Sequence, residues 1–448
     1  MKTARAFLHR RTWFLKWLPV AAIAAAVGFC GLAAFGQGAA GFDPADILVK
    51  PRRGVDLAAV NRALGLHTRR VFPAIGNLSV IQVPPGATAD DLIGVYRQSG
   101  LVKYAERDYY LHTLATPDDP GYTGGYQWSL RNTGQNGGTA GADIHAWEAW
   151  NYATSAENII VAVVDTGIRY THQDLAANMW VNPADGSHGI NVTDNGRAAN
   201  DPWDDYGHGS HVAGIIGAAT DNGMGIAGIC WNVQLMACKF LDSSGQGTVS
   251  GAIDCLDFAR EYGAKVVNAS WGDFTTFKSQ SLHDAIASLR DADIIFVAAA
   301  GNSGVNNDVT PLYPASYSDL DNVLSVAATD DPDRLTSWSD YGATNVDLAA
   351  PGADIVSCWN GSDSDYEIDQ GTSQACAEVT GACALLRAYF PNENHQQIIQ
   401  QLLKGTDPLP TLAGKCRTGG RLDLLNALGG APTSSPPPTG GPGHKHHK

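Results

Sequence analysis

The sequence predicts an α/β fold in which helices cover both faces of a mostly parallel sheet, preceded by a smaller α+β module. Between about residues 116 and 430, the strand-like segments are continuous apolar or β-branched runs without polar alternation. Strands buried on both faces have this pattern. Helix-like segments separate these runs, and such alternation is typical of a layered α/β domain.

Residues 44–114 form the smaller module. Strand-like runs occur at 46–51, 67–72, 78–84 and 101–109, and helical stretches occur at 55–66 and 88–100. The order strand, helix, strand, strand, helix, strand predicts a ferredoxin-like α+β fold. Because the module directly follows an N-terminal leader, we expect a removable pro-segment spanning 41–115. The alternative is an ordinary N-terminal domain.

The first 40 residues have the order of a secretory signal peptide. Five basic residues (Lys2, Arg5, Arg10, Arg11 and Lys16) lie before or at the start of the apolar run WLPVAAIAAAVGFCGLAAF, and small residues follow at 36–40. This order predicts export and cleavage. The run is also close to membrane-spanning length, so an uncleaved anchor is the alternative. We therefore expect a secreted protein, or a periplasmic or surface protein if it is retained.

Composition narrows the function classes further. The net charge of −15 argues against a general nucleic-acid binder, and we expect a monomer. Without Cys30 the chain keeps seven cysteines, an odd number, so at least one thiol stays unpaired or pairs with another chain. The Pro-, Gly- and His-rich tail 431–448 has nothing to pack and is expected to be disordered.

The larger region contains the elements that a parallel sheet needs. Its predicted strands are 159–165, 233–240, 264–270, 293–301 and 322–329, and its helices include 249–263, 282–292 and 376–391. In such sheets, functional groups gather at the carboxyl ends of the strands. Asp165 ends one predicted strand, and Asn302 directly follows another.

Two further segments carry reactive side chains. The stretch DDYGHGSHVAGIIG places His208 in a glycine turn, from which a helix packing through small residues can start. The stretch DQGTSQACAEV places Ser373 ahead of an apolar helical run. Ser373 is either a helix N-cap or a nucleophile.

An acid, a histidine and a serine from separate segments can form a nucleophilic relay. The histidine takes the serine proton, and the acid orients the imidazole and stabilises its cation. Asn302 would donate its side-chain N–H to the developing oxyanion. Taken singly, Asp165 and Asn302 also fit turns, and His208 fits a structural histidine. Glycine-rich surroundings at all four positions favour the catalytic interpretation.

Four blocks in this order, VAVVDTGI, DDYGHGSHVAG, AAAGNSG and GTSQA, resemble the signatures of the subtilisin-like serine proteases, in particular the thermitase-like ones. The resemblance implies a secreted serine endopeptidase in which Asp165 orients, His208 is the general base and then acid, Ser373 attacks and Asn302 holds the oxyanion. It implies that His211 is structural.

The resemblance also divides the chain. It implies a signal peptide at 1–40, an inhibitory propeptide at 41–115, a catalytic domain at 116–430 and a tail at 431–448. Partners are then protein or peptide substrates and the chain's own propeptide, released by cleavage near 113–116.

Substrate peptides would add as a strand between two segments. The implied substrate-binding residues are Gly245, Gln246, Gly247, Ser270, Trp271, Gly272, Ala300 and Gly301. Because the walls at 270–272 and 299–301 carry no charge, we expect a large apolar or aromatic residue before the scissile bond.

The resemblance also implies a structural Ca²⁺ site. Its expected ligands are the side chains of Asp119, Asp174 and Asn222 and the carbonyls of Ala219, Met224 and Ile226. Oxygen ligands of these kinds suit Ca²⁺. The alternative is a turn rich in Asp and Asn.

The segment after the serine departs from the family. Where the family usually has Met-Ala-x-Pro-His, this chain has Gln374, Ala375, Cys376, Ala377 and Glu378. Ala377 removes a first-turn preference without a clash, so the helix should still form. Glu378 either is tolerated at the positive helix end or raises the pKa of His208. Gln374 removes an oxidisable thioether, which predicts resistance to peroxide unless Cys376 is a new weak point.

Two other functions compete with the protease. A catalytically silent relative that binds peptides is favoured only by the altered segment after Ser373. An esterase of the α/β-hydrolase type would need the order Ser, Asp, His and a GxSxG elbow, and both are absent.

Overall fold

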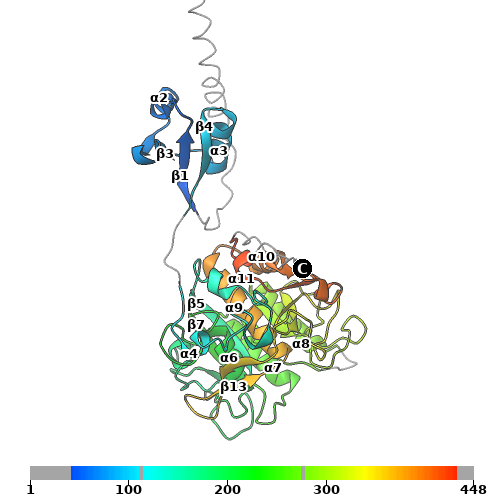
Figure 1. The fold of residues 1–448 in the computed structure, drawn as a ribbon. Helices are drawn as coiled ribbons and strands as arrows, with labels where there is room; N and C mark the ends of the chain where they lie inside the picture. The colour runs from blue at the N-terminus through cyan, green and yellow to red at the C-terminus, as the bar shows by residue number, and fades with distance from the viewer. Residues whose placement is uncertain (1–41, 110–114, 274–277, 431–448) are drawn as a thin grey trace, which may run out of the picture. The chain divides into compact units, whose positions relative to one another are not determined.

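The computed structural model describes residues 42–109, 115–273 and 278–430. The chain divides into two compact units, Met1–His112 and Thr113–Lys448 (Figure 1). The predicted leader 1–40 and tail 431–448 lie outside the described residues. Within the described residues, no helix has both the length and the apolar character needed to cross a bilayer.

The smaller unit has the predicted order of elements. It comprises β1 (Phe42–Pro51), α2 (Leu57–Ala63), β2 (Thr68–Phe72), the short 3₁₀ turn η1 (Pro73–Ile75), β3 (Leu78–Gln82), α3 (Ala89–Gln98) and β4 (Val102–Tyr109). The strands form an antiparallel sheet in the order β2-β3-β1-β4. Thr88 and Asp91 close a capping box at the start of α3. The ferredoxin-like prediction is confirmed.

The larger unit is built on a nine-stranded sheet in the order β14-β15-β11-β10-β9-β8-β5-β7-β6. Its strands are β5 (Ser155–Asp165), β6 (Gly189–Asn191), β7 (Asn232–Lys239), β8 (Val266–Ala269), β9 (Ile295–Ala299), β10 (Val323–Thr329), β11 (Leu348–Pro351), β14 (Asp407–Pro408) and β15 (Gly420–Arg421). Every pairing is parallel except that of β14 with β15. A separate antiparallel hairpin joins β12 (Ile355–Cys358) and β13 (Tyr366–Asp369).

The helices of this unit are of very different lengths. They are α4 (Pro120–Thr123), α5 (Ala146–Ala149), α6 (His208–Gly217), α7 (Val249–Glu261), α8 (Gln280–Asp291), α9 (Thr372–Tyr389), α10 (His395–Gly405) and α11 (Leu424–Ala427), with 3₁₀ turns η2 (Gln135–Gly137), η3 (Ala176–Asn178) and η4 (Pro410–Leu412). The five predicted strands correspond to β5, β7, β8, β9 and β10. The sequence did not predict β11 or the β12–β13 hairpin, whose runs are only four residues long.

The residues of β5 show that the sheet is covered on both faces. Val161 and Val163 belong to an apolar cluster that includes residues of α6 and α9. Their neighbours Ala162 and Val164 belong to a second cluster, with residues of α7 and α8. Successive side chains of a strand point to opposite faces, so two helical layers enclose the sheet. The predicted α/β architecture is confirmed.

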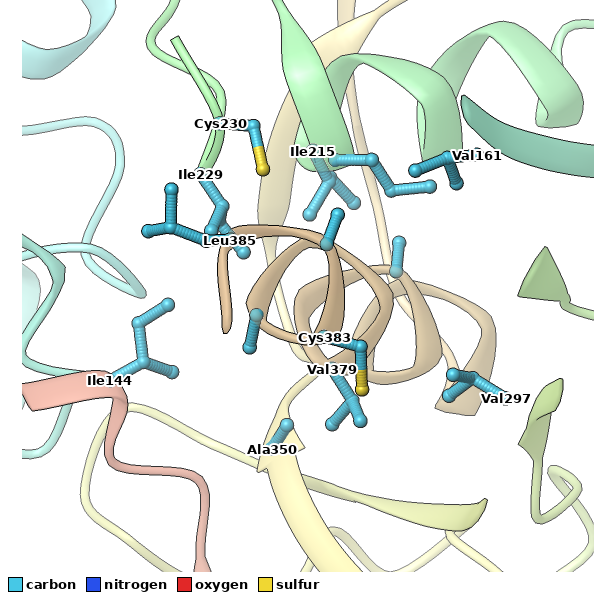
Figure 2. Close-up of a cluster of buried hydrophobic side chains, with 14 of the residues drawn as sticks. Ile144, Val161, Ile215, Ile229, Cys230, Val297, Ala350, Val379, Cys383 and Leu385 are labelled. Carbon is cyan, nitrogen blue, oxygen red and sulfur yellow. The ribbon is translucent and has the colours of Figure 1, made fainter. Parts of the chain in front are cut away.

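Helix α9 is buried around its circumference from Thr372 to Arg387. Figure 2 shows Val379, Cys383 and Leu385 on this helix, among apolar side chains of surrounding elements. Gly381 lets Ile229 approach, since a Cβ there would lie 2.9 Å from the Ile229 Cβ. All seven cysteines in the described part of the chain are buried and free of disulfides.

The strand order places the candidate catalytic segments together. Strands β9, β8 and β5 are neighbours and run parallel. Asp165 ends β5, Ser270 directly follows β8, and Asn302 lies three residues after β9. Because parallel strands end at the same edge of a sheet, these residues share one edge.

Candidate active site

Asp165 is fully buried at the end of β5. Its Oδ1 accepts hydrogen bonds from the backbone N–H of Thr166 at 2.7 Å and from Nδ1 of His208 at 2.8 Å. Its Oδ2 has no partner among the described residues. The bond from Nδ1 puts the proton on that nitrogen and leaves Nε2 of neutral His208 as an acceptor.

His208 is the first residue of α6, and a glycine turn positions it. Gly207 has a φ of +118°, and a Cβ there would lie 2.5 Å from the Trp359 ring. Its place therefore requires glycine, both for the backbone conformation and for the close approach of the ring. Gly209 is equally confined, because a Cβ would lie 2.0 Å from the Gly167 carbonyl oxygen. The predicted packing of this helix through small residues is confirmed.

Asp204 connects the turn before α6 to the end of β5. Its carboxylate accepts from the backbone N–H groups of Tyr206, Gly207 and Ser210 at 2.8–3.0 Å. It also accepts from the Thr166 hydroxyl at 2.9 Å. The motif DDYGHG contains this signal, an acid four residues before His208, but the motif alone does not reveal the role of Asp204.

The buried side chain of Lys239 forms hydrogen bonds to three segments at the same edge of the sheet. Its Nζ donates to the carbonyls of Thr166 at 2.7 Å and Leu241 at 2.8 Å, and to Asp205 at 2.7 Å. A buried ammonium is stable only when it is paired and hydrogen-bonded. Lys239 thus holds the residue after Asp165 in place, a function that sequence reasoning missed.

The pKa of His208 is raised to about 9 by neighbouring carboxylates. Burial alone would lower it, but the charge and hydrogen bond of Asp165 outweigh that effect, and the charges of Asp369 and Asp204 add to it. Glu378 is not one of these carboxylates. It is 1% exposed, and burial raises its own pKa to about 8, so it is mostly uncharged at neutral pH. Of the two alternatives for Glu378, the one in which its charge raises the pKa of His208 is therefore wrong.

Ser373 is the second residue of α9 and is nearly buried. The N-cap position belongs to Gly371, so the interpretation of Ser373 as the capping residue is wrong. The Ser373 hydroxyl donates to the Ser270 carbonyl at 3.2 Å, and the Ser270 hydroxyl donates to the Ser373 carbonyl at 2.9 Å. Despite Ala377 and Glu378, α9 is continuous, as the sequence predicted.

Two N–H donors converge beside Gly371. The Asn302 Oδ1 accepts from the backbone N–H and the hydroxyl of Thr372, both at 2.9 Å, which directs Nδ2 away from Thr372. A Cβ on Gly371 would lie 3.2 Å from Asn302 Nδ2 and 3.5 Å from the Ser373 backbone nitrogen. First-turn N–H groups lack partners within their helix, so both donors are available to an oxygen that gains negative charge. The acceptor Gln374 Oε1 lies 2.9 Å from the same Cβ point, so that point is not itself the position of the oxygen.

The expected substrate residues are partly brought together. Gly245, Gln246, Gly247, Trp271 and Gly272 line one cavity of about 430 Å³. The Trp271 indole donates to the Val164 carbonyl at 2.8 Å, and its ring packs edge-on against Phe240.

The second wall lies around Leu312. A Cβ on Gly272 or on Gly301 would lie 2.4 or 2.7 Å from its side chain. Ala300 is fully buried in a separate apolar cluster that includes Ala327, Val346 and Ala349. Sequence reasoning missed Asp340, whose unpartnered Oδ2 lies 2.1 Å from a Cβ built on Gly301, and burial raises its pKa.

The residues expected to bind Ca²⁺ also converge. Asp119 and Asp174 are fully buried, and neither takes part in an ion pair among the described residues. Asp119 Oδ2 accepts from the Asp221 N–H at 2.9 Å, and Asp174 accepts from Asn222 Nδ2 at 3.1 Å and from the Tyr366 hydroxyl at 2.8 Å.

Three carbonyls complete the expected set of ligands. Within the described residues, the carbonyl oxygens of Ala219, Met224 and Ile226 accept no hydrogen bond. Unused oxygens beside two buried carboxylates without a cation fit the ligand preference of Ca²⁺.

Comparison with known proteins agrees with this geometry. Residues 156–429 match the model of the subtilase family, and residues 33–108 match the model of the fervidolysin N-terminal prodomain. The chain belongs to the subtilase family, and it is a serine-type endopeptidase with an N-terminal prodomain.

Three relatives illustrate the match. The chain is 37% identical over 328 residues to a thermophilic serine proteinase of Bacillus sp. (strain AK1), covering 73% of each chain. It is 31% identical over 421 residues to halolysin of Haloferax mediterranei, covering 91% of this chain and 74% of halolysin. It is 36% identical over 271 residues to thermitase of Thermoactinomyces vulgaris, covering 60% of this chain and 85% of thermitase.

Proposed function

We propose that this subtilase is an exported endopeptidase, made as a proenzyme, in which Asp165, His208, Ser373 and Asn302 cleave peptide bonds through an acyl-enzyme. The observation that carries the proposal is the 2.8 Å bond between Asp165 and His208, at the sheet edge where Ser373 in the first turn of α9 is hydrogen-bonded to Ser270. The leader-like sequence at 1–40 supports export.

In the first step, the Ser373 hydroxyl leaves the Ser270 carbonyl and turns toward Nε2 of His208. Oγ bonds to the substrate carbonyl carbon while Nε2 takes its proton. The carbonyl oxygen becomes negative, and Asn302 Nδ2 and the Ser373 backbone N–H stabilise it. His208 then gives the proton to the leaving amine nitrogen as the C–N bond breaks.

In the second step, water replaces the amine. His208 takes a proton from the water, whose oxygen bonds to the acyl carbon, and returns it to Ser373 Oγ as the ester bond breaks. Asp165 keeps Nδ1 protonated and stabilises the imidazolium in both steps. The products are the carboxylic acid, which then ionises in water, and the regenerated serine.

The surroundings of the site support a preference for large apolar residues before the scissile bond. The Leu312 side chain lies against both Gly272 and Gly301, one from each of the two uncharged walls at 270–272 and 299–301. Among the described residues, two acids lie beside these walls, Asp273, which lines the same cavity, and Asp340, whose pKa is raised by burial. A strong preference for Lys or Arg in a peptide library would instead assign one of these carboxylates to substrate binding.

Ca²⁺ would supply the positive charge that Asp119 and Asp174 lack. Asn222 and the carbonyls of residues 219, 224 and 226 would complete its coordination. The role is structural, because none of these residues contacts the proposed catalytic groups.

Expression of residues 41–430 as the wild type and as Ser373→Ala tests the proposal. The wild type is expected to release its propeptide near residues 113–116 and to hydrolyse casein, and Ser373→Ala is expected to do neither. Ser364→Ala, at an exposed serine, is the matched control and should behave as wild type. A folded wild type that neither matures nor hydrolyses peptides would favour the silent, peptide-binding relative.

A further inference from the structure

A second carboxylate approaches the candidate active site from strand β13. Asp369 is the last residue of this strand and lies four positions before Ser373. Its Oδ1 accepts from the Gln370 backbone N–H at 2.8 Å, and its Oδ2 accepts from Nε2 of Gln374 at 3.2 Å. Its side chain is half-buried, so its charge is only partly screened by water.

Gln374 connects this carboxylate to helix α6. Nε2 of His211 faces the carbonyls of Ile355 at 3.1 Å and Glu367 at 3.3 Å, so this nitrogen carries the proton. Nδ1 is then an acceptor, and Gln374 Nε2 lies 3.4 Å from it. Gln374 is 1% exposed, and its Nε2 directs one N–H toward Asp369 and one toward His211, while its Oε1 has no partner among the described residues. A methionine at position 374 would supply neither donor.

We propose that Asp369, anchored through Gln374 to His211, is a second carboxylate that stabilises protonated His208, and thus a positioning residue for the general base. The inference rests on the proposed function, because it assigns His208 the proton transfers. It gives a role to Gln374, one of the residues at which this chain departs from the usual family sequence.

The charges around His208 support this role. The hydrogen bonds of Gln374 to Asp369 and to His211 place the Asp369 carboxylate beside the first turn of α6, the helix that begins at His208. Burial lowers the pKa of His208, and the charges of Asp165, Asp369 and Asp204 raise it. His211, one turn further along α6, does not oppose them, because burial lowers its pKa to about 4 and keeps it neutral.

The charged groups on the other neighbouring elements are already compensated. Lys239 on β7 is paired with Asp205. Glu378 on α9 is mostly protonated at neutral pH, and burial keeps the thiols of Cys376 on α9 and Cys358 on β12 protonated. Removal of the half-buried Asp369 carboxylate therefore changes the field at His208 without breaking the bond between His208 and Asp165.

The test is the pH dependence of kcat/KM for Asp369→Asn, measured on the matured enzyme. The midpoint of the acidic limb is expected to fall by about half to one pH unit, the effect of one nearby charge that is partly screened. The alkaline plateau should stay within about twofold of wild type, because His208 is neutral there in both proteins. A structural defect would instead lower activity at every pH.

Two matched variants separate a local charge from net charge. Asp369→Glu keeps the carboxylate and should retain most of the wild-type midpoint. Glu367→Gln removes an exposed acid two residues away on the same strand and should leave the midpoint unchanged. Equal shifts for Glu367→Gln and Asp369→Asn would overturn the inference.

The role of Gln374 is tested by Gln374→Met in two backgrounds. If Gln374 acts through Asp369, the substitution shifts the midpoint in wild type and does not shift it in Asp369→Asn. If Gln374→Met shifts the midpoint equally in both backgrounds, Gln374 does not act through Asp369. If Asp369→Asn alone leaves the wild-type midpoint unchanged, the inference as a whole is overturned.

Failure of maturation is also decisive. If both Asp369→Asn and Asp369→Ser fail to mature, Asp369 is structural and the inference falls. A wild type without peptidase activity contradicts the proposed function, whereas an active enzyme whose midpoint ignores Asp369 contradicts only this inference.

Discussion

Replacing Glu378 by glutamine should stabilise the protein in a strongly pH-dependent way. Glu378 is 1% exposed in α9, its Oε2 has no partner among the described residues, and burial raises its pKa from 4.5 to about 8 although a hydrogen bond from Ser129 opposes the shift. The folded chain therefore holds this proton more tightly than the unfolded chain does. Stability must fall as the pH rises from about 4.5 to about 8.

The magnitude follows from the size of the shift. Each pKa unit corresponds to about 1.4 kcal/mol, so the ionisable carboxyl costs about 1 kcal/mol at pH 5 and about 4 kcal/mol at pH 8. Glu378→Gln keeps the shape and removes the ionisation. Relative to its parent, the variant should gain about 3 kcal/mol of unfolding free energy between pH 5 and pH 8, a relative rise in Tm of roughly 5–10 °C.

Urea and thermal unfolding at both pH values would measure this gain, in a Ser373→Ala background that prevents self-digestion. Glu157→Gln, at an exposed position on β5, is the control and should change stability little at either pH. If Glu378→Gln changes stability equally at pH 5 and pH 8, the carboxyl is not held protonated by burial and the reasoning fails.

Three other predictions follow from the site. Because His208 acts as a base only when neutral and its pKa is about 9, kcat/KM should rise with pH to a midpoint about 9, and a midpoint below about 7 would contradict the charge arrangement. The same shift sets the histidine's share of stability, which is complete below pH 6.5 and is lost as the pH rises through about 9. Removal of Ca²⁺ by a chelator should lower Tm by roughly 5 °C or more, because a bound ion stabilises the folded chain by mass action, and added Ca²⁺ should restore the Tm. Asp174→Asn should abolish this response to the chelator. An unchanged Tm would instead indicate a simple turn rich in Asp and Asn. Peptidase activity should withstand peroxide, because Gln374 has no thioether and burial raises the pKa of the Cys376 thiol to about 12. The Gln374→Met variant should be inactivated by peroxide. Rapid inactivation of the wild type by peroxide would contradict this prediction.

Much of the fold could be read from local patterns. The continuous apolar runs of β5, β7, β8, β9 and β10 show burial on both faces, a property that each segment carries by itself. The β12–β13 hairpin could not be predicted, because its strands are four residues long and Ile368 is 65% exposed, which is no sign of a core strand.

The candidate site divides in the same way. Asp165, His208, Asn302 and Ser373 each stand in a short glycine-rich block, so the sequence by itself determined the chemistry that this edge of the sheet can support. Local sequence also determined that α9 continues past Ala377, since helix formation depends mainly on neighbouring residues.

Only the tertiary structure decided which carboxylates act on His208. Glu378 and Asp369 lie at similar distances along the chain from Ser373, on opposite sides of it, and only Glu378 stands in a segment that departs from the family pattern. Folding buries Glu378 in an apolar helix layer, where its charge is suppressed, and leaves Asp369 half-buried with Gln374 as its donor. Whether a carboxylate is charged, and how strongly it acts on His208, depends on its burial and on its distance from His208 in the folded chain. A local sequence motif contains neither quantity.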